Sequence, residues 1–244
     1  MLKSLDALNE GFREIVKKSK EECGDKLEEI RQLTFIIGIF FKSFKESFSR
    51  SKEYGVRVGS SLALMCFVEL FRISGHILFL SCNGLYRNAF DNIRYALESI
   101  VQALYIDHRH PKTPIEIKIE ILKEVEDKRE YHAMRLIDEL EIDHKDTLKR
   151  QYKELSRIIH PSHKQIISTL SDLEEDRGVP TTISCKEISK IYDSMIRMYD
   201  IFFFLYINYF PEVKEALKKN SDFIELIKVY NLTLLSKIFK IRLD

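Results

Sequence analysis

The chain has 244 residues, of which 45% are apolar and 32% are charged, so it carries enough apolar side chains for a core and is not a disordered protein. Its 39 Lys and Arg residues are balanced by 38 Asp and Glu residues, which excludes a uniformly basic nucleic-acid binder. Only 8 glycines and 5 prolines argue against a turn-rich β protein, and the abundance of Lys, Glu, Ile and Leu favours helices.

The first part of the chain predicts two helices. Apolar residues recur three and four apart over residues 1–23, Gly24 then supplies a stop, and a second apolar stripe follows over residues 26–50. We expect residues 1–58 to form a helical hairpin that packs on a main bundle formed by residues 59–244.

Residues 59–82 are apolar nearly all round, which is typical of a helix that other helices surround in a domain core. We therefore expect this helix at the centre of the bundle. No alternating strand pattern and no glycine-rich phosphate loop occur. The sequence thus predicts an all-α fold, an antiparallel bundle of about eight helices, whose later members cover residues 85–107, 113–141, 144–160, 184–209, a short segment after Pro211, and 221–240.

The cysteines are far apart in the sequence and form no CxxC pair, so neither a zinc site nor a redox dithiol is indicated. We expect them to be reduced, buried thiols. They are Cys23, Cys66, Cys82 and Cys185.

The N-terminal residues lack the apolar region of a secretory signal, which predicts a cytoplasmic protein. The longest apolar runs, residues 35–41 and 201–207, are far shorter than the ~18 residues that a membrane span needs. We expect no transmembrane helix and no membrane partner.

Metal and cofactor sites are not indicated. His108 and His110 flank Arg109 in a predicted loop that has few neighbouring ligand residues, and an exposed loop explains them. No ExxH pair recurs on two helices, as a di-iron site in a bundle would need. We expect no metal and no cofactor.

The residues best suited to chemistry lie close together near the end of the helix predicted over 144–160. Arginine offers a planar cationic fork for phosphate, and histidine exchanges a proton near neutral pH. Together they suit metal-independent cleavage of an RNA phosphodiester. These candidates are Arg157, His160, His163 and Lys164. An ordinary solvated face is the competing interpretation, because the helical period places Lys153, Arg157, His160 and Lys164 opposite the apolar stripe of their helix.

A stripe of alternating charge marks the polar side of the helix predicted over residues 85–107. Two interpretations remain open: surface salt bridges within the helix, or a buried polar network at the border of the site. Its members are Arg87, Asp91, Arg94 and Glu98.

Arg157, five intervening residues and His163 match the R-x(4-6)-H pattern of the HEPN superfamily, and the helix RNAFDNIRYALESIVQALY with the later S-x-x-x-H-P-S segment resembles uncharacterised prokaryotic members. The resemblance covers about residues 59–210. It departs from the family where Ile158 follows the arginine and where Pro161 separates the two motif residues, which leaves an inactive or divergent member as an alternative.

The resemblance implies a metal-independent endoribonuclease of a defence or toxin system. Arg157 would stabilise the phosphate, His163 or its substitute His160 would act as general acid or base, and Glu98 or Asp91 would orient one of them. Lys164, Arg94, Asp91 and Arg87 would contact the substrate. The resemblance also implies a homodimer, RNA as a partner and a protein partner such as an antitoxin. The alternative function is a helical interaction module without catalysis that binds a protein or a nucleotide.

Overall fold

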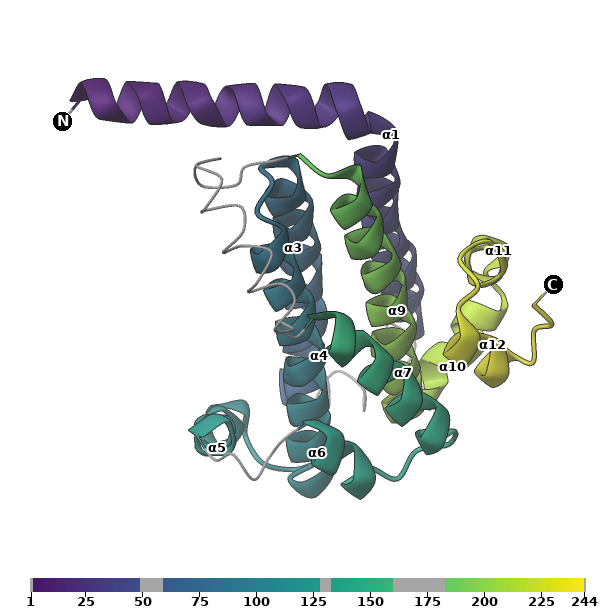
Figure 1. Cartoon of the computed structure of the whole chain (residues 1–244). Coiled ribbons are helices and arrows are strands. Elements are labelled where there is room, and N and C mark those ends of the chain that lie inside the picture. Colours follow the sequence, from purple (N-terminus) through teal and green to yellow (C-terminus); the bar gives the residue numbers. More distant parts are fainter. Residues whose placement is uncertain (1, 49–58, 128–132, 160–182, 244) are drawn as a thin grey trace.

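The computed structural model describes residues 2–48, 59–127, 133–159 and 183–243. Within these ranges the chain forms ten helices and no strand, which confirms the predicted all-α class. Figure 1 shows long helices gathered into a bundle, with shorter helices packed on its side and at one end.

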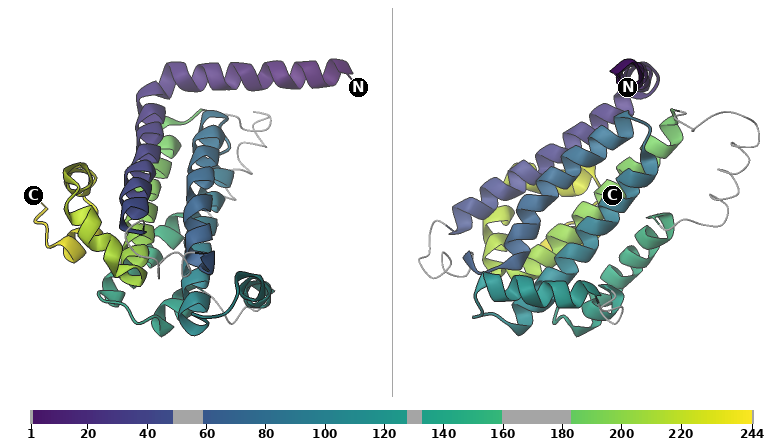
Figure 2. Two further views of the ribbon diagram at one scale, coloured as in Figure 1. Left: turned by 180° about the vertical axis from the view of Figure 1, so that it is seen from behind. Right: turned by 90° about the vertical axis from the view of Figure 1, so that its left-hand side faces the viewer.

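Four helices make up the bundle. The second half of α1 and the whole of α4 each contact both α3 and α9, while α3 and α9 touch each other little, so the four surround a common core (Figures 1 and 2). α3 runs antiparallel to α1 and α4 on either side of it. The four are α1 (Leu2–Phe48), α3 (Leu62–Cys82), α4 (Tyr86–Arg109) and α9 (Cys185–Tyr209).

Six shorter helices pack on this bundle. α7 crosses α4 and α9, α6 connects α4 with α7, and the last three helices pack against α1 and α9 (Figure 1). The helix predicted over residues 113–141 is described as two helices, α5 and α6, with residues 128–132 outside the described part. The six are α5 (Ile115–Asp127), α6 (Ala133–Glu139), α7 (Lys145–Ile159), α10 (Pro211–Lys218), α11 (Ser221–Val229) and α12 (Thr233–Phe239).

The predicted N-terminal hairpin is wrong. The backbone of α1 leaves helical geometry at Cys23, with φ −130° and ψ 24°, one residue before the predicted stop at Gly24. Figure 1 shows that the segment before this kink turns away from the bundle instead of folding back along the second half. The two parts of α1 behave differently because of their packing. The buried apolar residues of α1 begin at Cys23 and continue with Leu27, Ile30 and Leu33, so only the part after the kink packs into the core.

The helix at the centre of the bundle is α9, not α3 as the sequence predicts. All residues from Ile201 to Ile207 are buried, so the aromatic run of α9 belongs to the core. Phe203 stacks on Phe40 of α1 with a centroid distance of 4.3 Å. α3, in contrast, leaves several large apolar side chains in solvent. A helix that is apolar on every side gives no periodic signal of which side packs, so its composition alone could not place it.

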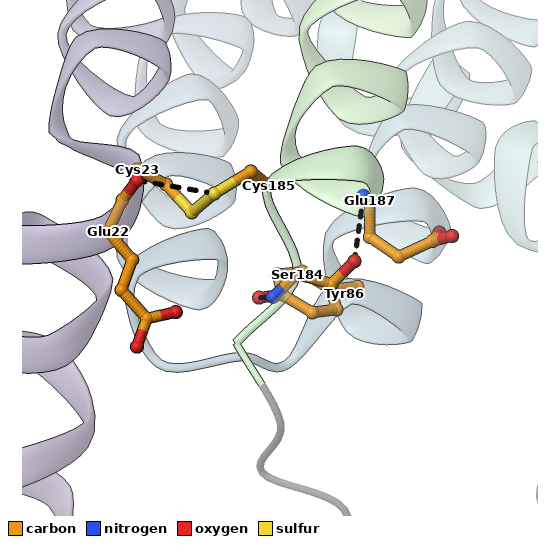
Figure 3. Close-up of a disulfide and its surroundings, with 6 residues drawn as sticks. All are labelled: Glu22, Cys23, Tyr86, Ser184, Cys185 and Glu187. Carbon is orange, nitrogen blue, oxygen red and sulfur yellow. Dashed lines mark hydrogen bonds between the residues drawn. A yellow bond between two sulfur atoms is a disulfide. The ribbon is translucent and has the colours of Figure 1, made fainter.

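The expectation of four reduced thiols is wrong for two of them. Cys23 at the kink of α1 forms a disulfide with Cys185 at the first residue of α9, across 162 residues of sequence (Figure 3). Cys66 and Cys82 keep their thiols and are half-buried. No spacing pattern in the sequence marks this pair. The two cysteines are distant in the sequence, and only the folded chain, with its bend in α1, brings them together. Intracellular proteins of hyperthermophiles also carry disulfides, so the bond does not decide the compartment.

By length and composition alone, α3 is the one helix in the described ranges that is apolar enough to cross a membrane, although the sequence predicts no transmembrane helix. A core helix of a soluble protein meets the same criteria. α3 also packs one side against α1 and α4.

A buried carboxylate from α4 caps the start of α3. Asp107 accepts hydrogen bonds from the Ser61 hydroxyl at 2.7 Å and from the backbone N–H groups of Leu62 and Ala63 at 3.2 and 3.0 Å. The ammonium of Lys118 lies 2.8 Å from the same carboxylate and also donates to the Ser60 carbonyl. Both charged side chains are almost fully buried, so this ion pair ties α4 and α5 to the N-terminus of α3.

Candidate functional site

The charged stripe of α4 resolves into two ion pairs between successive turns of the helix. Arg87 lies 3.0 Å from Asp91, and both side chains are nearly half exposed. The Nε of Arg94 donates to Glu98 at 2.8 Å, and this pair is more enclosed. The first pair therefore fits the surface interpretation, whereas the second borders the junction between α4 and α7.

A tyrosine from α7 completes this junction. Tyr152 is buried, and burial raises the pKa of its hydroxyl, with a further rise from the negative charge of Glu98 and a smaller opposing effect of Arg94. The hydroxyl of Tyr152 also hydrogen-bonds to Ser156 one turn later in α7. We name Arg94, Glu98, Tyr152 and Ser156 the junction network. Its hydrogen bonds lie within α4 and within α7, and the charges of Glu98 and Arg94 act on Tyr152 between the two helices.

The outward face of α7 carries a row of cations. Apolar side chains at Leu148, Tyr152 and Leu155 point into the core, and the helical period then turns residues 150, 153 and 157 to the opposite side. All three are exposed, as the sequence predicts for the last two. We name Arg150, Lys153 and Arg157 the α7 basic row.

The structure describes only part of the role that the sequence predicts for Glu98 and Asp91, because His160 and His163 lie outside the described residues. The carboxylate of Glu98 pairs with Arg94, and among the described residues it has no hydrogen bond or ion pair with Arg157. The reason is geometric: Glu98 lies at the inner side of α7, next to Tyr152, whereas Arg157 is on the solvent side. Asp91 is likewise engaged with Arg87. Within the described residues, both carboxylates therefore pair with arginines of α4 and not with Arg157, and the predicted contact with a histidine stays a prediction.

The other three residues predicted for the site, His160, His163 and Lys164, lie outside the described residues. The last described residue before them is Ile159 at the end of α7. Arg157 is thus the one member of the predicted motif that the structure describes.

Sequence reasoning missed a polar cavity beside α7, which Arg150 of the α7 basic row also lines. It has a volume of about 600 Å³ and lies between α7, α9 and the segment that joins α11 to α12. Arg197 lies 3.3 Å from Glu154 across its wall. The residues that line it include Arg150, Gln151, Glu154, Asp193, Arg197, Asp200, Tyr230 and Asn231.

Asp200 in the wall of this cavity caps α12 from α9. Its carboxylate accepts hydrogen bonds from the backbone N–H groups of Leu234 and Leu235 at 2.8 and 3.0 Å, and from the Gln151 amide at 3.1 Å. Burial raises the pKa of this carboxyl to about 6, because these neutral donors offset only part of the lost hydration. The sequence did contain a signal, since Asp200 is a lone acid in the apolar stretch MYDIFFFLY.

The raised pKa predicts a pH dependence of stability. Between about pH 6 and the usual pKa near 3.8, folded Asp200 binds a proton that the unfolded chain does not bind. Its contribution to stability therefore rises as the pH falls through this window, by about 3 kcal/mol at most. The free energy of unfolding of Asp200→Asn, measured from pH 4 to pH 7.5, should lack this contribution. A difference between wild type and variant that stays constant with pH would contradict the assignment.

In the described ranges no cluster of three or more His, Cys, Asp or Glu side chains is placed to hold a metal ion. Fold and site together define an all-α bundle with an exposed basic row beside a polar helix junction. Comparison with protein-family models, with curated proteins and with solved structures finds no match for this chain.

Proposed function

We propose that this protein is a metal-independent endoribonuclease of the HEPN type that binds RNA along α7. The α7 basic row is the observation that carries the proposal. Its three cations stand on one exposed helix face within about 10 Å of one another along the helix axis. Lys and Arg side chains in such a row neutralise consecutive phosphates of a nucleic-acid backbone, even in a chain whose net charge is only +1.

The cations of the α7 basic row and the two histidines have distinct roles in this proposal. Arg150 and Lys153 hold the backbone of the RNA, and Arg157 donates to the phosphate whose bond is cleaved. His163, with His160 as its substitute, takes the proton of the 2′-hydroxyl, and the resulting oxygen attacks the neighbouring phosphorus. The 5′-oxygen then leaves with a proton from a general acid. The products are a 2′,3′-cyclic phosphate and a 5′-hydroxyl.

The packing of α7 supports this arrangement indirectly. Leu148, Tyr152 and Leu155 are buried where α7 contacts α4 and α9, so Arg157 projects from a helix that is held by its apolar side. Lys164 adds a cation after the end of α7. A cytoplasmic location and a protein partner such as an antitoxin remain predictions that accompany this function.

Replacement of Arg157 by alanine should lower the rate of RNA cleavage by about 10² or more, because the charge that develops on the phosphate loses its donor. His163→Ala should lower the rate by about 10² to 10⁴. The measurement is the single-turnover cleavage of a labelled single-stranded RNA.

Arg135→Ala is the matched control, since Arg135 is an exposed arginine on α6 and is not a member of the α7 basic row. It should cut as fast as the wild type. Melting temperatures of all variants should be unchanged, because exposed charges contribute little to stability. Equal rates for the wild type, Arg157→Ala and His163→Ala would overturn the proposed site.

One observation favours the second candidate, an interaction module without catalysis. α3 presents a broad apolar surface to solvent, which is typical of a contact with another macromolecule. If the wild type cleaves no RNA, this candidate takes the place of the first.

A further inference from the structure

The outward side of α3 is apolar along most of its length. Four large apolar side chains there are half or more exposed, whereas monomeric proteins seldom expose so many neighbouring apolar groups on one helix. Tyr95 of α4, which is 52% exposed and near Arg72 of α3, extends the surface onto the next helix. We name this surface the α3 face; its apolar members on α3 are Met65 (50% exposed), Val68 (57%), Phe71 (61%) and Phe79 (64%).

Gly75 is exposed in the middle of the α3 face. No contact within this chain requires a glycine at this position. A Cβ atom added there would meet nothing within 4 Å. Glycine is among the weakest helix formers, so its position inside a regular helix is unfavourable unless something else approaches closely. The absent side chain leaves a shallow gap between the exposed side chains before and after it. Such a gap admits the backbone of another helix.

The α3 face is symmetric about this glycine. Phe71 lies four residues before Gly75 and Phe79 four residues after it, while Val68 and Cys82 lie seven residues on either side. If two copies of α3 cross antiparallel at Gly75, each Phe71 meets the Phe79 of the other copy. A contact of this kind is isologous, because the same patch serves both partners.

We propose that the α3 face binds a second copy of this chain about a two-fold axis at Gly75. The charges of the face agree with this occupant. Its ion pair, Glu69 with Arg72, makes it neutral, so a second copy is not repelled. A lipid surface fits less well, because anionic membranes select faces fringed with Lys and Arg, and these two charges lie in the middle of the helix.

Light scattering tests the proposal on the whole chain. The wild type should give about twice the 28.9 kDa mass of one chain, and Phe79→Glu should give the mass of one chain with an unchanged circular dichroism spectrum. Val229→Glu is the matched control, because Val229 is 66% exposed but lies on α11; it should keep the mass of the wild type.

A cross-link locates the axis. Val68→Cys should form a disulfide with Cys82 of the other copy under mild oxidation, since positions 68 and 82 lie seven residues on either side of the axis, whereas Val229→Cys should not. A wild type that is monomeric at high concentration would overturn the proposal, as would a dimer that Phe79→Glu leaves intact. Binding of a monomeric wild type to phosphatidylcholine vesicles would show that the α3 face serves a membrane instead. This proposal does not depend on RNA cleavage, so either can fail without the other.

Discussion

Lys118→Met will lower the free energy of unfolding by about 3–5 kcal/mol, because it leaves the buried carboxylate of Asp107 without its cation. Methionine keeps most of the volume of lysine, so the loss will come from the uncompensated charge and not from a cavity. Urea unfolding followed by circular dichroism measures the change. The start of α3 should be the first part to loosen, since Asp107 caps its N-terminal N–H groups.

Lys123→Met is the control for this experiment. Lys123 lies on the same helix, α5, but its side chain is exposed, and its replacement should change the free energy of unfolding by less than about 0.5 kcal/mol. An equally small change for Lys118→Met would mean that the Asp107 carboxylate is satisfied by Ser61 and the backbone alone.

Cys185→Ser will lower the free energy of unfolding by about 2–5 kcal/mol. The disulfide between Cys23 and Cys185 spans 162 residues, and a bond that closes a loop of this length removes much conformational entropy from the unfolded chain. The loss should appear as a lower urea midpoint. The same substitution frees the kink of α1 from the start of α9, which Figure 3 shows joined by this bond.

Cys82→Ser provides the comparison, since Cys82 is a free thiol and its replacement removes no covalent bond. Dithiothreitol should lower the stability of the Cys82→Ser variant and leave Cys185→Ser unchanged. If dithiothreitol has no effect on either variant, the two cysteines do not form a stabilising bond in solution.

The helices were predictable because each carries a local signal. α9 begins within one residue of its predicted start at residue 184, where the Ser184 hydroxyl caps the helix by accepting from the Glu187 N–H at 3.3 Å. The predicted stop at Gly24 lies one residue from the kink of α1, although the predicted fold-back of the chain there is wrong. Such signals lie within a few residues of one another, and the sequence displays them directly.

Features that join distant segments were not predictable in the same way. Asp107 and Asp200 cap helices to which they do not belong, and only the folded chain brings these carboxylates to the N–H groups that they satisfy. The disulfide depends on the bend of α1 for the same reason. For the site, the helical spacing of residues correctly predicted that Arg157 is exposed to solvent. It could not show that Glu98 forms an ion pair with Arg94 on the inner side of α7.

The most direct test of the proposed function is the chemistry of the RNA ends that the wild type produces in the presence of EDTA. Attack by the 2′-hydroxyl predicts fragments that end in a 2′,3′-cyclic phosphate and begin with a 5′-hydroxyl, formed at the same rate with and without the chelator. The absence of any cleavage, or fragments with a 5′-phosphate whose formation EDTA abolishes, would contradict the assignment of this protein as a metal-independent endoribonuclease.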